Sequence, residues 1–268
     1  MKAKKILFIT TEISPFVTDS DKATMGRILP QTIQETGHEI RTFMPKWGNI
    51  NERRNQLHEV IRLSGMNLII DDTDHPLIIK VASLPSARMQ IYFIDNDDYF
   101  TKRGILTGKD GQEYEDNGER AIFYARGVLE TVKKLRWVPD VIHCHGWAAA
   151  LAPLYIKKAY NEDPSFKNTK VVFSASSEEF KNDLGVKQAQ CVEYKDITFD
   201  DVADICAEKF THTELQKVAV KFSDGLILDD ENVAPEVIDY AKSINVPVLE
   251  CQGKDFKEAY GEFYDSIM

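Results

Sequence analysis

The segment Pro139–Ile156 constrains the fold most strongly, because it joins a buried strand to a helix with almost no linker. Val141, Ile142 and Cys144 form a short, mostly apolar pattern that is typical of a buried strand. A helix is expected to begin near Trp147, and His145 lies at the turn between the two elements. Because ligands of α/β proteins bind just outside the carboxyl ends of parallel strands, this turn is a candidate binding site.

The same alternation of strand and helix runs through most of the chain. Ile6–Thr10 reads as a buried strand, Asp21–Glu35 as an amphipathic helix ended by Gly37, and Glu39–Met44 as a second strand. These elements form a βαβ unit with a right-handed parallel crossover. Later strands are predicted at 170–173, 225–228 and 247–251, and helices at 116–135, 147–160, 201–208, 213–222, 234–243 and 255–266.

Two regions depart from this alternation. Residues 57–94 contain several strand-like stretches separated by short polar turns, which predicts an antiparallel insertion of hairpins beside the parallel sheet. Residues 178–200 are polar and irregular, and a loop is expected there. The alternation otherwise continues to the last residues, so residues 1–268 are expected to form a single domain with no second domain after it.

Composition and charge exclude several classes of protein. A hydrophobic fraction of 43% supports a folded core, and a net charge of −10 argues against a nucleic-acid partner. A membrane span or a signal peptide is not expected, so we predict a cytoplasmic protein with reduced thiols. The four cysteines are scattered without zinc-like spacing, and hydrolase motifs are missing. We therefore predict no metal and no cofactor.

The segment around His145 resembles the histidine-aspartate-tryptophan-histidine turn of bacterial glycogen synthases and plant starch synthases. His145 and Trp147 match the first histidine and the tryptophan, whereas Gly146 and Ala148 replace the aspartate and the second histidine. Members of this family transfer glucose from ADP-glucose to a growing α-1,4-glucan. The family's first histidine contacts the transferred glucose, so the resemblance implies a substrate-binding role for His145 and Trp147.

Further motifs extend the resemblance over most of the chain. Glu12-Ile13-Ser14-Pro15-Phe16 is similar to the family's Glu-x-x-Pro-Phe, and 37–48 to its Gly-His-Glu-Val-Arg and Met-Pro-x-Tyr-Gly. The most specific block is 95–120, whose family counterpart borders the acceptor side of the cleft. Planar amides, carboxylates and aromatic rings suit sugars. The implied glucan-binding candidates are Asp95, Asn96, Tyr99, Phe100, Tyr114, Asp116, Asn117 and Arg120.

A structural reading of the block 95–120 remains open. In this reading, Asn96 and Asn117 fix turns, Asp116 caps the long helix, and Arg120 pairs with a carboxylate.

At two other positions the sequence lacks the polar residues that the family motifs contain. The family's Lys-x-Gly-Gly loop approaches the nucleotide-sugar phosphates, but here Thr18 stands at the lysine, and Ser20 and Asp21 stand at the glycines. Asp19 and Asp21 would repel a diphosphate. Alternatively, Ser20 is the N-cap of the helix and Asp21 sits in its first turn. Ser176 and Ser177 replace a histidine and an asparagine at another cleft edge.

The resemblance implies an α/β fold with a doubly wound, mostly parallel, Rossmann-like sheet and a β-hairpin insertion, equivalent to one half of a GT-B fold. Three functional hypotheses follow. The first is a relative that binds α-1,4-glucan or maltooligosaccharide, or regulates glucan metabolism, with no catalytic residues and no transferase activity of its own. The second is half of an ADP-glucose-dependent transferase completed by a separate glycosyltransferase domain, and the third is a protein-interaction scaffold without sugar affinity.

Overall fold

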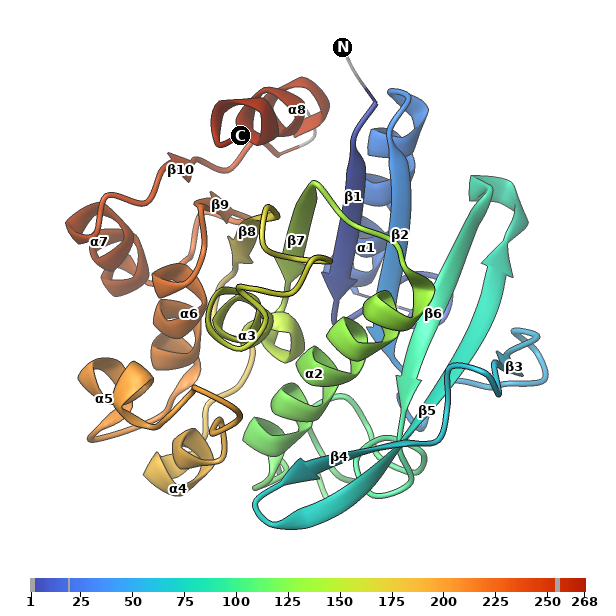
Figure 1. Ribbon diagram of the computed structural model, residues 1–268, viewed down its shortest axis with the longest axis horizontal. Coiled ribbons are helices and arrows are strands. Elements are labelled where there is room, and N and C mark those ends of the chain that lie inside the picture. The colour runs from blue at the N-terminus through green and yellow to red at the C-terminus, as the bar shows by residue number, and fades with distance from the viewer. Residues whose placement is uncertain (1–2, 19, 254–255) are drawn as a thin grey trace.

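The computed structural model of the protein describes residues 3–18, 20–253 and 256–268, and a mixed sheet runs through its centre (Figure 1). The strand order is β10-β9-β8-β7-β1-β2-β6-β5-β3, with β4 paired to β5 alone. The parallel strands are β1 (Lys5–Thr10), β2 (Glu39–Pro45), β6 (Met89–Asp95), β7 (Val141–His145), β8 (Lys170–Ala175), β9 (Gly225–Leu228) and β10 (Val248–Leu249).

The sheet reverses its strand order between β1 and β7. From β1 the chain proceeds outward through β2 to β6, and then returns to β7 on the other side of β1. In register, Ile6 lies opposite Val141, and Thr10 lies opposite His145. The carboxyl ends of β1 and β7 therefore meet at one level, which forms the switch point where doubly wound sheets bind ligands.

Helices cover both faces of the sheet because the strand side chains alternate between two cores (Figure 1). Ile6 and Phe8 pack with α1 (Asp21–Glu35) and α8 (Phe256–Ser266). Leu7 and Ile9 belong to the larger core on the opposite face. That core includes residues of α2 (Asn117–Leu135), η2 (Trp147–Ala149), α3 (Ala152–Lys158), α4 (Gly185–Gln190), α5 (Asp200–Cys206), α6 (His212–Lys221) and α7 (Pro235–Ser243).

The predicted antiparallel insertion is present over the expected residues. It contains β3 (His58–Glu59), β4 (Met66–Ile70), β5 (Thr73–Leu84) and η1 (Pro85–Ala87). β5 pairs antiparallel with β3, β4 and β6. β6 also pairs parallel with β2, so it belongs to the main sheet.

Two other predicted elements differ from the structure. The stretch 178–200 contains the short helix α4, whose Gln188 side chain hydrogen bonds to Glu119 of α2. The helix expected over 147–160 is divided into η2 and α3, and Pro153 stands in the first turn of α3, where its missing N–H costs nothing. Asp255, the expected first residue of the last helix, lies outside the described residues.

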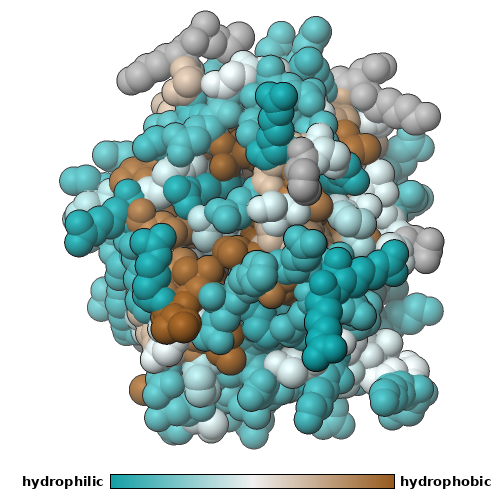
Figure 2. Space-filling model, turned by 90° about the vertical axis from the view of Figure 1, so that its right-hand side faces the viewer, coloured by the Kyte–Doolittle hydropathy of each residue, from teal (hydrophilic) through white to brown (hydrophobic). Residues whose placement is uncertain are grey.

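The surface is mixed in polarity. Figure 2 shows one face that is largely hydrophilic, with hydrophobic residues exposed near its centre. Ile61, at 82%, is the most exposed of the large hydrophobic side chains in the described part of the chain. Among the described helices, none is long and apolar enough to cross a membrane.

Candidate functional site

A pocket of about 360 Å³ opens at the switch point. We call it the switch pocket. The start of α1, the last residue of β7 and the residues that follow β8 and β9 contribute to it. Its lining residues are Asp21, Lys22, Met25, His145, Ser176, Ser177, Asp229, Asp230, Asn232, Gln252, Gly253 and Tyr260. The pocket lies where β7 ends, which is the turn that the sequence predicted as a binding site.

His145 is the last residue of β7, and both of its ring nitrogens have protein partners. Nε2 lies 2.6 Å from Oδ2 of Asp229, and Nδ1 lies 3.2 Å from Oγ1 of Thr10. Burial alone would lower the pKa of His145, but the adjacent Asp229 carboxylate outweighs burial and raises this pKa above its usual value. The imidazole is therefore held in place and biased toward its charged form.

Glu179 is the most heavily bonded carboxylate beside the switch pocket. Its Oε1 accepts hydrogen bonds from the backbone N–H of Trp147 at 3.0 Å and from the Ser176 hydroxyl at 3.1 Å. Nζ of Lys22 lies 3.0 Å from Oε2, and Nε2 of His212 lies 3.5 Å from Oε1. Burial alone would raise the pKa of Glu179, but His212 and Lys22 outweigh it and hold this pKa at about 2.

The turn after β7 is set by a glycine and a buried tryptophan. Gly146 has φ +84°, and a Cβ there would lie 2.4 Å from Oγ1 of Thr11. Trp147 is 1% exposed, and its ring stacks on Trp47 with the centroids 6.0 Å apart. Trp147 thus packs beneath the site, while His145 lines the switch pocket.

Arg120 anchors the block 95–120 from inside the molecule. It is fully buried, and it donates hydrogen bonds to the carbonyl groups of Tyr99, Gly104 and Ile105 and to Oδ1 of Asn117. The predicted pairing of Arg120 with a carboxylate is wrong, because backbone carbonyls satisfy the guanidinium. Burial lowers the pKa of Arg120 to about 9, which leaves it charged at neutral pH.

Asp116 does not cap α2 as expected. It occupies the N-cap position, but its side chain makes no capping hydrogen bond. Both carboxylate oxygens instead accept from the guanidinium of Arg103. Charge-assisted pairing of this bidentate kind is stronger than a bond to one backbone N–H.

The remaining candidates of this block lie in the interior, with exposures of 2% or less. Asn96 Oδ1 accepts the N–H groups of Asp98 and Tyr99, so its predicted role in fixing a turn is confirmed. Asn117 also ties the loop, because its Nδ2 donates to the Leu106 carbonyl. Oδ2 of Asp95 lies 2.8 Å from Nζ of Lys80. The same buried layer includes Tyr99, whose hydroxyl donates to Glu119, and Phe100, which packs edge-on against Trp47.

Tyr114 and Asp116 instead reach the surface. They line a shallow trough of about 760 Å³ together with Lys102, Arg103, Gly108, Lys109, Asp110, Gln112, Glu113 and Glu115. The structure therefore brings His145 to the switch pocket and these two residues to the trough. The other seven candidates pack inside the molecule.

Sequence reasoning missed several groups at the switch pocket. Asp229 follows β9 directly, so the rule that placed His145 at a strand end could also have found it. Lys22 supplies a positive charge that the sequence did not reveal, although it is paired with Glu179. The N-cap interpretation of Ser20 is confirmed, because its hydroxyl accepts the N–H of Ala23. Asp21 lines the pocket, and Asp19 lies outside the described residues.

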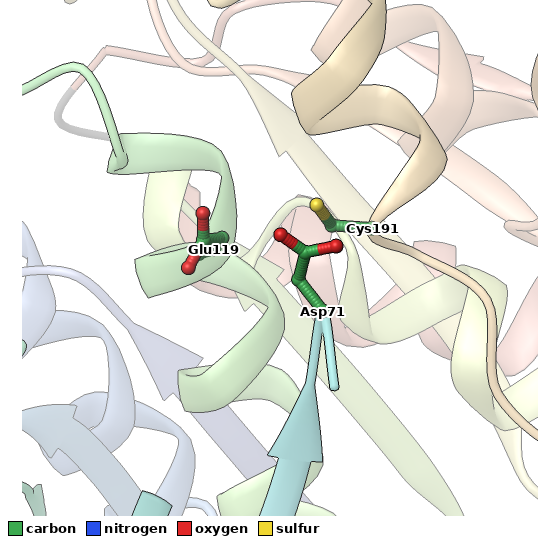
Figure 3. Close-up of side chains that lie close together, drawn as sticks. All are labelled: Asp71, Glu119 and Cys191. Atoms are coloured by element: carbon green, nitrogen blue, oxygen red, sulfur yellow. The ribbon is translucent and has the colours of Figure 1, made fainter. Parts of the chain in front are cut away.

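A group elsewhere could hold a metal ion, although the sequence predicted none. Asp71, Glu119 and Cys191 offer ligand atoms that lie within 4.8 Å of one another (Figure 3). Burial raises the pKa of the Cys191 thiol to about 11, so it is protonated at neutral pH and a weak metal ligand. The thiol also donates to the carbonyl of Lys187.

Comparison of the sequence with known proteins identifies the family of this chain. The family model of the starch synthase catalytic domain matches residues 5–246. Glycogen synthase of Chlorobium limicola is 42% identical over 171 residues, which cover 63% of this chain and 35% of that protein. Glycogen synthase of Chlorobaculum tepidum is 42% identical over 169 residues, with the same two coverages. The chain thus spans about a third of the length of these relatives.

A solved structure shows the same fold. The catalytic domain of starch synthase IV from Arabidopsis thaliana, bound to ADP and acarbose, matches with a TM-score of 0.76 at 14% identity. The match covers 96% of this chain and 53% of that one. The predicted Rossmann-like, GT-B type of fold is therefore confirmed. With its switch-point pocket and the family match over residues 5–246, the chain belongs to the starch synthase catalytic domain family, whose glycogen and starch synthases act in α-glucan metabolism.

Proposed function

We propose that this chain binds an α-1,4-glucan or a maltooligosaccharide at the switch pocket, and that it does not hold a nucleotide diphosphate there. The observation that carries this proposal is the charge of the lining. Asp21, Asp229 and Asp230 contribute three carboxylates. The two cationic groups of the lining are already paired, Lys22 with Glu179 and His145 with Asp229. A neutral ligand suits this balance better than an anionic ligand.

The lining also suits sugar hydroxyl groups. Carboxylates accept hydrogen bonds, and the side chains of Ser177, Asn232 and Gln252 both donate and accept. Tyr260 adds an aromatic ring to the wall, although only 3% of this residue is exposed. Family membership supports a glucan among neutral polyols, because the matched relatives are glycogen synthases and the starch synthase IV structure holds acarbose.

We propose that a longer glucan also contacts the trough. The segment 176–182 begins in the wall of the switch pocket, and its far end is bonded to the loop that lines the trough. The carboxylate of Glu113 accepts the N–H groups of Lys181 and Asn182 at 2.9 and 2.8 Å. Tyr114 and Asp116 are therefore the candidates from the block 95–120 that we retain as glucan contacts.

Isothermal titration with maltoheptaose and, separately, with ADP-glucose tests this proposal. His145→Ala and Tyr114→Ala are compared with wild type, and His58→Ala serves as a matched control because His58 is exposed on β3. We expect saturable maltoheptaose heat in wild type and His58→Ala, a loss of at least about tenfold in affinity in His145→Ala, and no heat from ADP-glucose.

The other outcomes would overturn the proposal in different ways. Saturable ADP-glucose binding would contradict the exclusion of the diphosphate and would support half of a transferase completed by a separate chain. An absence of binding heat with both maltoheptaose and ADP-glucose would contradict glucan binding and would support a protein-interaction scaffold.

A further inference from the structure

Four polar groups from four separate segments surround the side chain of Glu179, two through hydrogen bonds and two through ion-pair contacts. They are the ammonium of Lys22 in α1, the backbone N–H of Trp147 after β7, the hydroxyl of Ser176 after β8, and the imidazole of His212 in α6. The donor-to-carboxylate distances range from 3.0 to 3.5 Å. The Glu179 side chain is only 5% exposed, so solvent contributes little to its solvation.

This set of donors is what an oxyanion needs. A lysine, a histidine, a hydroxyl and a backbone N–H make charge-assisted hydrogen bonds to carboxylate or phosphate oxygens alike. Here a side chain of the protein itself fills the position. Without Glu179, the imidazole of His212 would lose this partner at 3% exposure, and the ammonium of Lys22 would lose it at 29% exposure. The loss is more costly for the buried group.

We infer that Glu179 is a built-in anion, which fills an oxyanion site beside the switch pocket and thereby excludes phosphate-bearing ligands from it. Glu179 is a residue that determines ligand specificity in this interpretation. The inference deepens the proposed function and rests on it for the identity of the pocket.

The oxyanion site adjoins the switch pocket through two shared residues. Lys22 and Ser176 contact Glu179 and also line the pocket. Oε2 of Glu179 faces the turn at Gly146, since a Cβ added to that glycine would lie 3.8 Å from this atom. Shortening the Glu179 side chain would therefore leave donors that point toward a space reachable from the pocket.

The test uses Glu179→Ala and inorganic phosphate. Titration calorimetry should show phosphate binding at least about tenfold tighter than in wild type, because each charge-assisted hydrogen bond regained contributes more than a neutral one. The thermal midpoint of Glu179→Ala should rise with phosphate concentration, and that of wild type should not. Glu178→Ala is the matched control, because Glu178 is exposed next in the chain and should behave as wild type.

A double variant locates the effect. Lys22→Met combined with Glu179→Ala should lose the gained phosphate binding. Should Glu179→Ala not fold in phosphate-free buffer, Glu179→Ser provides a second variant, and folding that depends on phosphate would support the inference. A folded Glu179→Ala protein that is indifferent to phosphate would overturn it. Equal phosphate affinity in wild type, or failure of both variants to fold even in saturating phosphate, would also overturn it.

Maltoheptaose is titrated into the same proteins to separate the two proposals. If Glu179→Ala gains phosphate binding but wild type gives no heat with maltoheptaose, the built-in anion is supported and glucan binding is contradicted. If wild type binds maltoheptaose but Glu179→Ala gains no phosphate binding, glucan binding is supported and the built-in anion is contradicted.

Discussion

His145 and Asp229 form an ion pair at the carboxyl edge of the sheet, with 2.6 Å between Nε2 and Oδ2. His145 ends β7, and Asp229 directly follows β9. The intervening strand β8 is followed by Ser176 and Ser177 of the same pocket wall. A histidine at a strand end is thus oriented by a carboxylate two strands away. This pairing explains how His145 keeps a defined position without the aspartate and the second histidine of the family motif.

Asp229→Asn should lower the pKa of His145. In wild type the raised pKa means that the ion pair stabilises the fold fully below about pH 6.5, the ordinary histidine pKa, and that this contribution is lost as the pH rises through the folded-state value. Without the carboxylate, burial dominates and lowers the pKa. Histidine-resolved NMR titration checks this, with Asp230→Asn as the control. An unchanged His145 pKa in Asp229→Asn would refute the assigned pairing.

His143 should make the protein sensitive to acid. It is fully buried between the hydroxyl groups of Tyr264 and Ser174, and burial lowers its pKa to about 3. The unfolded chain binds a proton near pH 6.5, so the contribution of His143 is present above that pH and is lost as the pH falls toward 3. Urea unfolding across this range should show a slope of up to about 1.4 kcal/mol per pH unit from His143. His143→Gln should flatten this slope, and an unaltered slope would contradict the neutral buried state.

Arg120 should contribute to stability through its bonds to backbone carbonyls. Arg120→Met leaves the carbonyls of Tyr99, Gly104 and Ile105 without their donor, and we expect a loss of about 3 kcal/mol or more in the free energy of unfolding. Arg62→Ala, at an exposed position, should change it by less than about 0.5 kcal/mol. Denaturant titration distinguishes these outcomes. Equal stabilities of the two variants would show that Arg120 does not anchor the block.

Gly146→Ala tests the backbone of the turn that follows His145. The positive φ and the close approach to Thr11 both oppose a Cβ at this position. Gly65 is a matched control, because its φ is +85° and a Cβ there would meet nothing within 4 Å. Both substitutions strain the backbone, but Gly146→Ala should cost at least about 1 kcal/mol more in unfolding free energy. Equal losses would mean that the turn relaxes around the added methyl group.

Much of the fold was predictable from sequence because its signals are local. The apolar runs of β1 and β7 and the capped, amphipathic α1 each carry their pattern within a few residues. α4 escaped prediction because it is short and polar, and its contacts with α2 come from distant residues such as Glu119. The place of β6 in the main sheet was also missed, because β6 pairs with an insertion strand on one side and a core strand on the other.

The candidate site was less predictable because the role of a polar residue depends on distant partners. Tyr99 and Arg120 are residue types that often contact sugars. Here both are buried, and their polar groups bond to other parts of the molecule. Glu179 lies in a stretch that reads as an ordinary surface loop. Only the folded chain shows that donors in α1, η2 and α6 and directly after β8 surround it.

The most direct test of glucan binding is a backbone and histidine NMR titration with maltoheptaose. Saturable shifts should be confined to His145, the residues that follow β8 and β9, and the trough around Tyr114. An equal concentration of ADP-glucose should leave those signals unchanged. Shifts located elsewhere, or no saturable shift up to millimolar maltoheptaose, would contradict glucan binding at the switch pocket.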